Sequence, residues 1–216
     1  MDPTYRSESR PPYLPLALFG IAFGYLEAAV VVYLRRIYYP DGFGFPLTPF
    51  MPDLWAVELG REAATIVMLG TAAWLAGRTR WERFGHFAFL FGLWDIAFYL
   101  GLVLTLGWPE SIMTWDILFL LPLPWTGPVL SPVLVSALII AAGVGIAFRE
   151  RRGRPITVGR VHWILGLLSL ALLLYSFMAN HAVATAGGVP ESFPWFLFGA
   201  GWLIGAGLAA DVVRRG

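Results

Sequence analysis

Apolar residues dominate six stretches of the chain, and polar, proline-rich or arginine-rich connections separate these stretches. A helix needs about 20 mostly apolar residues to cross the hydrocarbon core of a bilayer, which is about 30 Å thick. The pattern therefore predicts an all-α integral membrane protein, a bundle of six transmembrane helices. The predicted spans are residues 14–34, 54–76, 84–106, 131–148, 158–183 and 193–213. Residues 1–13 then form a short N-terminal tail, and residues 14–216 form a single transmembrane domain.

The composition agrees with residence in a membrane. Hydrophobic residues make up 58% of the chain and charged residues 13%, whereas soluble domains carry roughly 25% charged residues. A net charge of +1 offers no basic surface for nucleic acid, so nucleic acid is excluded as a partner. The chain has no cysteine, which excludes disulfides, thiolate metal sites and cysteine nucleophiles. We expect the lipid bilayer itself to be a partner.

Most of the arginines fall on one side of the six predicted spans. Short cytoplasmic loops are enriched in positive residues, so both termini are predicted to be cytoplasmic. The arginines on that side are Arg6, Arg10, Arg78, Arg80, Arg83, Arg149, Arg151, Arg152, Arg154, Arg160, Arg214 and Arg215. Arginine is used without lysine, which suggests a GC-rich genome. We expect a multi-pass protein of a bacterial or archaeal cytoplasmic membrane.

The fourth segment, residues 116–148, is too long for one simple span, because as a helix it would measure about 50 Å. Internal prolines break or kink helices, and Ser131 followed by Pro132 is typical of a helix start. The prolines of this segment are Pro122, Pro124, Pro128 and Pro132. We expect a spanning helix over 131–148. Over 116–130 we expect a short helix and an irregular piece that partly re-enters the outer leaflet. The alternative is one long, tilted, kinked helix.

Polar residues within the predicted spans lie at mid-membrane or toward the outer side. They are Glu27, Glu58, Arg61, Glu62, Asp95, Asp116, Asn180 and His181, while His86 and His162 lie at the inner rim beside arginines. Ionisable groups inside a membrane are costly and are therefore candidates for function. We predict a carboxylate-rich site open to the outer side. Its candidate catalytic groups are Glu27, Glu58, Glu62, Asp95, Asp116 and His181.

Two stretches of sequence look alike: WDIAFYLGL, residues 94–102, and WDILFLLPL, residues 115–123. Each places an aspartate directly after a tryptophan at the start of an apolar run. Two halves of three spans are typical of inverted-repeat transporters, but this pair lies on neighbouring segments rather than at equivalent positions. The pair is weak support for a repeat, and we expect both aspartates to join the outer site.

The stretch ELGREAAT, residues 58–65, places Glu58 and Glu62 on one helical face. Arg61 can reach Glu58 three positions away, or Glu27 from the first span. One hypothesis is that carboxylates here hold a divalent metal ion as cofactor, because hard ions prefer oxygen ligands. The candidate ligands are Glu58, Glu62, Asp116 and His181. The alternative is a structural ion pair between Glu58 and Arg61.

A second hypothesis concerns anions and the walls of the site. Arg35, Arg36 and Arg61 can hold a phosphate or carboxylate at the outer surface, although the first two can instead contact lipid headgroups. Trp125, in a proline-rich stretch, and Asn180, at the outer end of the fifth span, are candidate substrate-lining residues.

Three functions fit this sequence. The first is a metal-dependent membrane enzyme, or a binding protein, for a lipid or lipophilic small molecule that reaches the site from the outer side. The second is an accessory subunit whose partners are other subunits of a membrane complex. The third is a transporter of a small ion or metabolite, which requires polar groups toward both faces. The polar residues gather on one side, which favours the first function.

Overall fold

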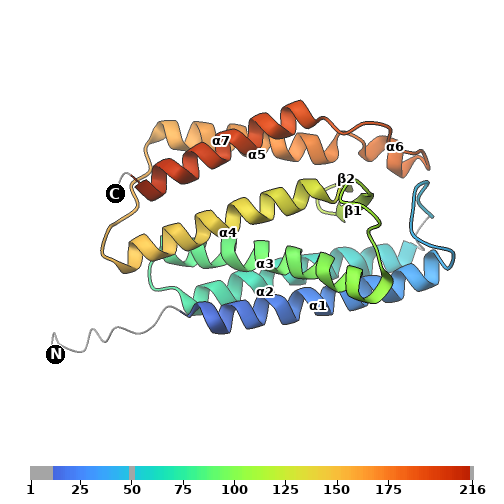
Figure 1. Cartoon of the computed structure of the whole chain (residues 1–216), viewed down its shortest axis with the longest axis horizontal. Helices are drawn as coiled ribbons and strands as arrows, with labels where there is room; N and C mark the ends of the chain where they lie inside the picture. Colours follow the sequence, from blue (N-terminus) through green and yellow to red (C-terminus); the bar gives the residue numbers. More distant parts are fainter. Residues whose placement is uncertain (1–11, 49–51, 215–216) are drawn as a thin grey trace.

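The computed structural model describes residues 12–48 and 52–214, so most of the predicted N-terminal tail lies outside the described residues. In these ranges, long helices run along one common direction and alternate in sense along the chain (Figure 1). They are α1 (Tyr13–Tyr38), α2 (Pro52–Ala76), α3 (Arg80–Leu106), α4 (Leu130–Arg151), α5 (Arg160–Met178) and α7 (Trp195–Arg214). A short helix, α6 (His181–Thr185), follows α5. The predicted helical spans are thus present to within a few residues at most ends.

Helix α3 lies in the middle of the bundle and packs against α1, α2 and α4, whereas α5 and α7 pack mainly against each other. Figure 1 shows α5 and α7 as a separate layer on the far side of α4. Glycines let α3 and α4 approach closely. A Cβ atom added to Gly143 would lie 2.4 Å from the carbonyl oxygen of Gly85, a distance that real side chains do not tolerate. Small residues at such crossings are typical of membrane helices.

Within residues 12–48 and 52–214, five helical segments are long and apolar enough to cross a membrane: α1, α3, α4, the α5–α6 segment and α7. Helix α2, which carries Glu58, Arg61 and Glu62, is not among them. Large apolar side chains also cover the outside of the bundle, as in Leu104 at 83% exposed and Phe196 at 86%. An apolar surface this extensive is typical of a protein surrounded by lipid.

The segment between α3 and α4 forms a β-hairpin, so the expected short helix over 116–130 is wrong. Strands β1 (Trp115–Phe119) and β2 (Trp125–Pro128) pair antiparallel, with Asp116 opposite Gly127. Prolines in and beside the turn exclude a helix here. The hairpin instead satisfies its backbone groups by pairing its own strands, which a buried segment requires.

Two helix ends differ from the prediction. Helix α4 begins at Leu130, and the hydroxyl of Ser131 donates a hydrogen bond to the carbonyl of Pro128 at 2.7 Å, so Ser131 is not the N-cap. Helix α5 ends at Met178, before the expected end of the fifth span, and the chain turns at Asn180 before α6. Asparagine favours such breaks, because its side chain competes for backbone hydrogen bonds.

Candidate functional site

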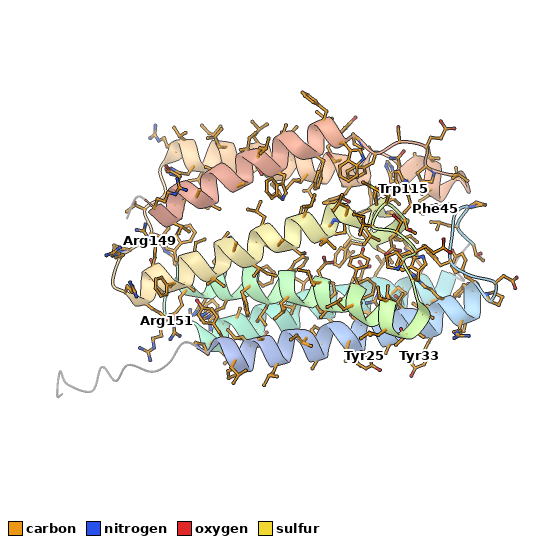
Figure 2. The ribbon with its side chains drawn as sticks, in the orientation of Figure 1. Tyr25, Tyr33, Phe45, Trp115, Arg149 and Arg151 are labelled. Carbon is orange, nitrogen blue, oxygen red and sulfur yellow. The ribbon has the colours of Figure 1, made fainter. Side chains whose placement is uncertain are left out.

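Five of the predicted site residues line one small cavity at the hairpin end of the bundle. They are Arg35 from α1, Glu58, Arg61 and Glu62 from α2, and Asp116 from β1. The cavity has a volume of about 90 Å³, which suits an ion with a few water molecules. Figure 2 shows this end, marked by Phe45 and Trp115, opposite the end that carries Arg149 and Arg151.

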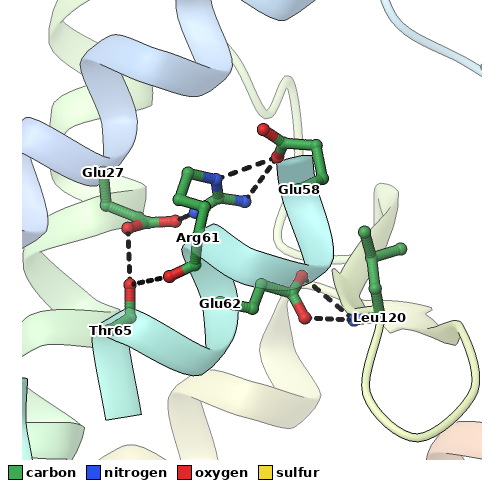
Figure 3. Close-up of polar contacts among 6 residues, drawn as sticks. All are labelled: Glu27, Glu58, Arg61, Glu62, Thr65 and Leu120. Atoms are coloured by element: carbon green, nitrogen blue, oxygen red, sulfur yellow. Dashed lines mark hydrogen bonds and ion pairs between the residues drawn. The ribbon is translucent and has the colours of Figure 1, made fainter. Parts of the chain in front are cut away.

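Arg61 holds two glutamates at once (Figure 3). Its guanidinium lies 2.7 Å from the carboxylate of Glu58, one turn away on α2, and forms an ion pair with Glu27 of α1. The hydroxyl of Thr65 lies 3.3 Å from the Glu27 carboxylate and 3.1 Å from the carbonyl of Arg61. The sequence predicts that Arg61 can reach Glu58 or Glu27, and both contacts are confirmed.

Glu62 joins α2 to the hairpin. Its two carboxylate oxygens accept the backbone N–H of Leu120 at 3.0 and 2.8 Å (Figure 3). Leu120 directly follows β1, where the strand pairing has ended. The carboxylate therefore satisfies a buried donor that would otherwise lack a partner, and it fixes the hairpin over the cavity.

Asp116 is 1% exposed and pairs with Arg35 at 2.8 Å. The same carboxylate accepts the N–H of Ile117 at 2.9 Å, and the hydroxyl of Tyr99 lies 3.4 Å away. Burial raises the pKa of the Asp116 carboxyl, and the Arg35 guanidinium opposes that rise. The ion pair thus links the end of α1 to the hairpin through a buried contact.

Aromatic rings enclose Arg35. Its guanidinium lies 4.2 Å from the ring centre of Phe43 and 3.7 Å from that of Trp108. Such cation–π contacts strengthen when water is excluded. One terminal nitrogen, Nη1, is buried with no hydrogen-bond partner among the described residues. Arg35 is therefore enclosed by two aromatic rings and one carboxylate, and one of its donor nitrogens makes no hydrogen bond within the described part of the chain.

Acidic groups outnumber basic ones around the cavity. Glu27, Glu58, Glu62 and Asp116 face only Arg35 and Arg61 in the contacts described above. Unbalanced buried negative charge is costly, so the cluster favours a bound cation or bound protons. The other residues lining the cavity, such as Tyr39, Phe43 and Ile117, are mainly aromatic or aliphatic.

Two larger hollows adjoin this cavity and share lining residues with it. One, of about 380 Å³, is lined by Arg35 and the exposed Arg36, together with Asp41 and Glu110. The other, of about 520 Å³, is mostly apolar, and its lining includes Leu47, Trp55, Ile117 and Leu120. Tyr39 lines the cavity and both hollows. Pockets for drug-sized ligands measure about 300–1,000 Å³, so the hollows are in that range and the cavity is not.

Asp95 does not line the cavity. Its carboxylate accepts a hydrogen bond from the hydroxyl of Ser136 on α4 at 2.8 Å. The indole of the neighbouring Trp94 does not donate to this acid, because its Nε1 is buried with no partner among the described residues. This hydrogen bond joins α3 to α4, so Asp95 contributes to the packing of these two helices.

His181, Asn180 and Trp125 also lie outside the lining of the cavity. His181 contacts the carbonyl of Met178 at 2.9 Å, and Asn180 donates to the carbonyl of Ser192 at 3.0 Å. Trp125 stacks on Phe177 with their ring centres 5.6 Å apart. The stacked pair Trp125–Phe177 joins the hairpin to α5, and the Asn180–Ser192 contact joins the connections on either side of α6.

The described residues contain no group of three or more histidine and carboxylate side chains placed to hold a metal ion. Of the candidate ligands, Glu58, Glu62 and Asp116 line the cavity and His181 does not. A divalent metal at this set of residues stays a prediction.

Several contributors to the site were not singled out from the sequence. Tyr99, Phe43 and Trp108 surround the Arg35–Asp116 pair, and the backbone of Leu120 binds Glu62. The stretch Gly107-Trp108-Pro109 indicates that Trp108 lies in a turn after a helix. It does not indicate that the Trp108 ring contacts Arg35. At the other end of the bundle, His86 is fully buried.

Comparison with protein-family models, with curated proteins and with solved structures finds no match to this chain.

Proposed function

We propose that the chain crosses a bacterial or archaeal cytoplasmic membrane six times, with both termini in the cytoplasm. The alternating helix directions support this topology, since the arginine-rich α2–α3 and α4–α5 connections lie at one end of the bundle (Figure 1). The hairpin then enters the outer leaflet from the opposite side. Irregular backbone at that depth is tolerated where protein buries it, as it does for Asp116 and Thr126.

The orientation can be tested with single cysteines, because the native chain has none. Glu191→Cys, in the connection before α7, should react with a membrane-impermeant maleimide in intact cells. Arg154→Cys, in the α4–α5 connection, should react only after the cells are permeabilised. The reverse labelling pattern would overturn the orientation.

We infer that the outer site binds a lipid or other lipophilic molecule whose polar end is positively charged. An amine, or a divalent metal ion held with the ligand, would supply that charge. One observation carries the proposal: in and beside the cavity, the carboxylates of α1, α2 and β1 exceed the arginines in number. The adjoining apolar hollow near Trp55 and Ile117 would take the apolar part of the ligand. If the protein is an enzyme, the same carboxylates would serve as general acid and base.

The test is elemental analysis of the purified, detergent-solubilised protein, with mass spectrometry of the lipids extracted from it. Wild-type protein should retain a stoichiometric metal or an amine-bearing lipid, and Glu62→Gln should lose it. Glu191→Gln, which removes an exposed acid that lines neither the cavity nor the two adjoining hollows, is the matched control and should retain it. Wild-type protein that carries neither would overturn the proposal and favour an accessory subunit or a transporter.

A further inference from the structure

A second, apolar cleft lies toward the arginine-rich end of the bundle, away from the outer site. Its volume is about 620 Å³, and four helices line it, with Phe84 from α3, Ile146 from α4, Leu167 from α5 and Leu208 from α7. It lies where the α5–α7 layer faces α3 and α4 (Figure 1). Nothing in the proposed outer site uses this cleft.

The polar residues of the cleft lie among the first residues of α3 and α5. Arg80 and His162 line it there, with Trp81 and Trp163 beside them. Tryptophans of membrane proteins concentrate at the depth of the lipid headgroups. The two indoles therefore place this part of the cleft at the headgroup level and its apolar remainder at the level of acyl chains.

The charge of Arg80 is available to a ligand. Arg80 is exposed and makes no ion pair or side-chain hydrogen bond within residues 12–48 and 52–214. The nearby acid Glu82 is paired with Arg151 at 2.5 Å. His162 is paired with Asp211 at 3.0 Å. The cleft thus offers one uncompensated cation beside an apolar chamber.

We propose that this cleft binds one anionic phospholipid, with an acyl chain between α4 and the α5–α7 layer and the phosphate on Arg80. Basic pockets between membrane helices on the cytoplasmic side are suited to anionic headgroups. The lining also matches a phospholipid in its order, because Arg80 and His162 lie beside two tryptophans and the remaining lining residues are apolar.

The experiment compares two lipids that share acyl chains and differ in headgroup. Purified protein in detergent is titrated with phosphatidylglycerol or phosphatidylcholine, and bound lipid is counted by native mass spectrometry. Wild-type protein should retain phosphatidylglycerol preferentially. Arg80→Gln should weaken that retention about fivefold, the factor that corresponds to about 1 kcal/mol for one arginine near an anionic lipid.

Two further variants make the result specific. Gly166→Leu should reduce retention of both lipids by filling the cleft, since a Cβ there meets only Leu208 at 3.9 Å. Arg154→Gln removes an exposed charge that does not line the cleft, and it should behave as wild type. Equal retention of both lipids by wild-type protein, or equal losses in Arg80→Gln and Arg154→Gln, would overturn the proposal. Glu62→Gln should leave this lipid bound, which separates the result from that of the outer site.

Discussion

The sequence Trp-Asp-Ile occurs twice and adopts two different structures. Residues 94–96 lie within the long helix α3, while residues 115–117 begin strand β1. The first aspartate, Asp95, meets the hydroxyl of Ser136. The second, Asp116, meets the guanidinium of Arg35 in a buried ion pair. The same three residues therefore serve helix packing in one place and a charged site in the other.

The surrounding residues decide between the two structures. Apolar helix formers continue on both sides of Asp95. Helix α3 ends at Leu106 and is followed by Gly107, which has the left-handed conformation that favours glycine. Asp116 follows a turn and precedes Pro122 and Pro124 by a few residues. A helix begun at Asp116 would meet those prolines within two turns, so the segment pairs with β2 instead. Its aspartate is thereby placed beside the end of α1.

The largest expected effect is that of Asp116→Asn. This substitution leaves the Arg35 guanidinium, 7% exposed, without a counter-charge. Removing one partner of a buried ion pair costs about 3–5 kcal/mol. The free energy of unfolding, measured by SDS titration in mixed micelles, should fall by that amount.

Asp41→Asn is the matched control, because Asp41 is exposed in the connection that follows α1. The control should change the unfolding free energy by no more than about 0.5 kcal/mol. The double variant Arg35→Met with Asp116→Leu should recover most of the lost stability, since it removes both charges. A loss below about 1 kcal/mol in Asp116→Asn would show that Arg35 is not an unpaired buried charge in that variant.

The long helices were predictable because each requires only a sustained apolar run. The hairpin was not, because its prolines excluded a helix without specifying what would replace it. The sequence expectation for 116–130 kept one helical piece, and that piece is wrong. Strand pairing between Asp116 and Gly127 depends on a turn geometry that single residues do not reveal.

The charged cluster was predictable in part. Arg61 and Glu58 are three positions apart on one helix, so their contact followed from helical geometry. The sequence predicts that Arg35 binds an anion at the outer surface. In the structure its partner is the carboxylate of Asp116, which lies 81 positions away in the chain. The backbone contact of Glu62 was not predictable, since it needs the position of a hairpin that was itself unknown. The predicted position of these residues along the membrane normal indicated which of them lie near one another, but it did not indicate which side chains form pairs.

A smaller effect is expected from Glu62→Gln, which loosens the hairpin carrying Asp116 and leaves α3 unchanged. The glutamine amide oxygen can still accept the Leu120 N–H, but it loses the stronger bond of a charged acceptor. The cost should be about 1–2 kcal/mol. Hydrogen exchange should accelerate at Leu120 and in β1, with no change near Asp95. Acceleration of equal size in α3 would show that the two Trp-Asp-Ile segments do not respond separately.

The smallest effect is expected from Asp95→Asn, the same substitution made in the helical copy. The asparagine oxygen can still accept the Ser136 hydroxyl, and no ion pair is lost, because Asp95 has no cation partner in the contacts of the described residues. The change in unfolding free energy should stay within about 1 kcal/mol, the net worth of one ordinary hydrogen bond. Ser136→Ala, measured alongside, should cost a similar amount. A loss of unfolding free energy in Asp95→Asn as large as that in Asp116→Asn would mean that Asp95 also neutralises a buried positive charge. The contrast between the two Trp-Asp-Ile segments would then be wrong.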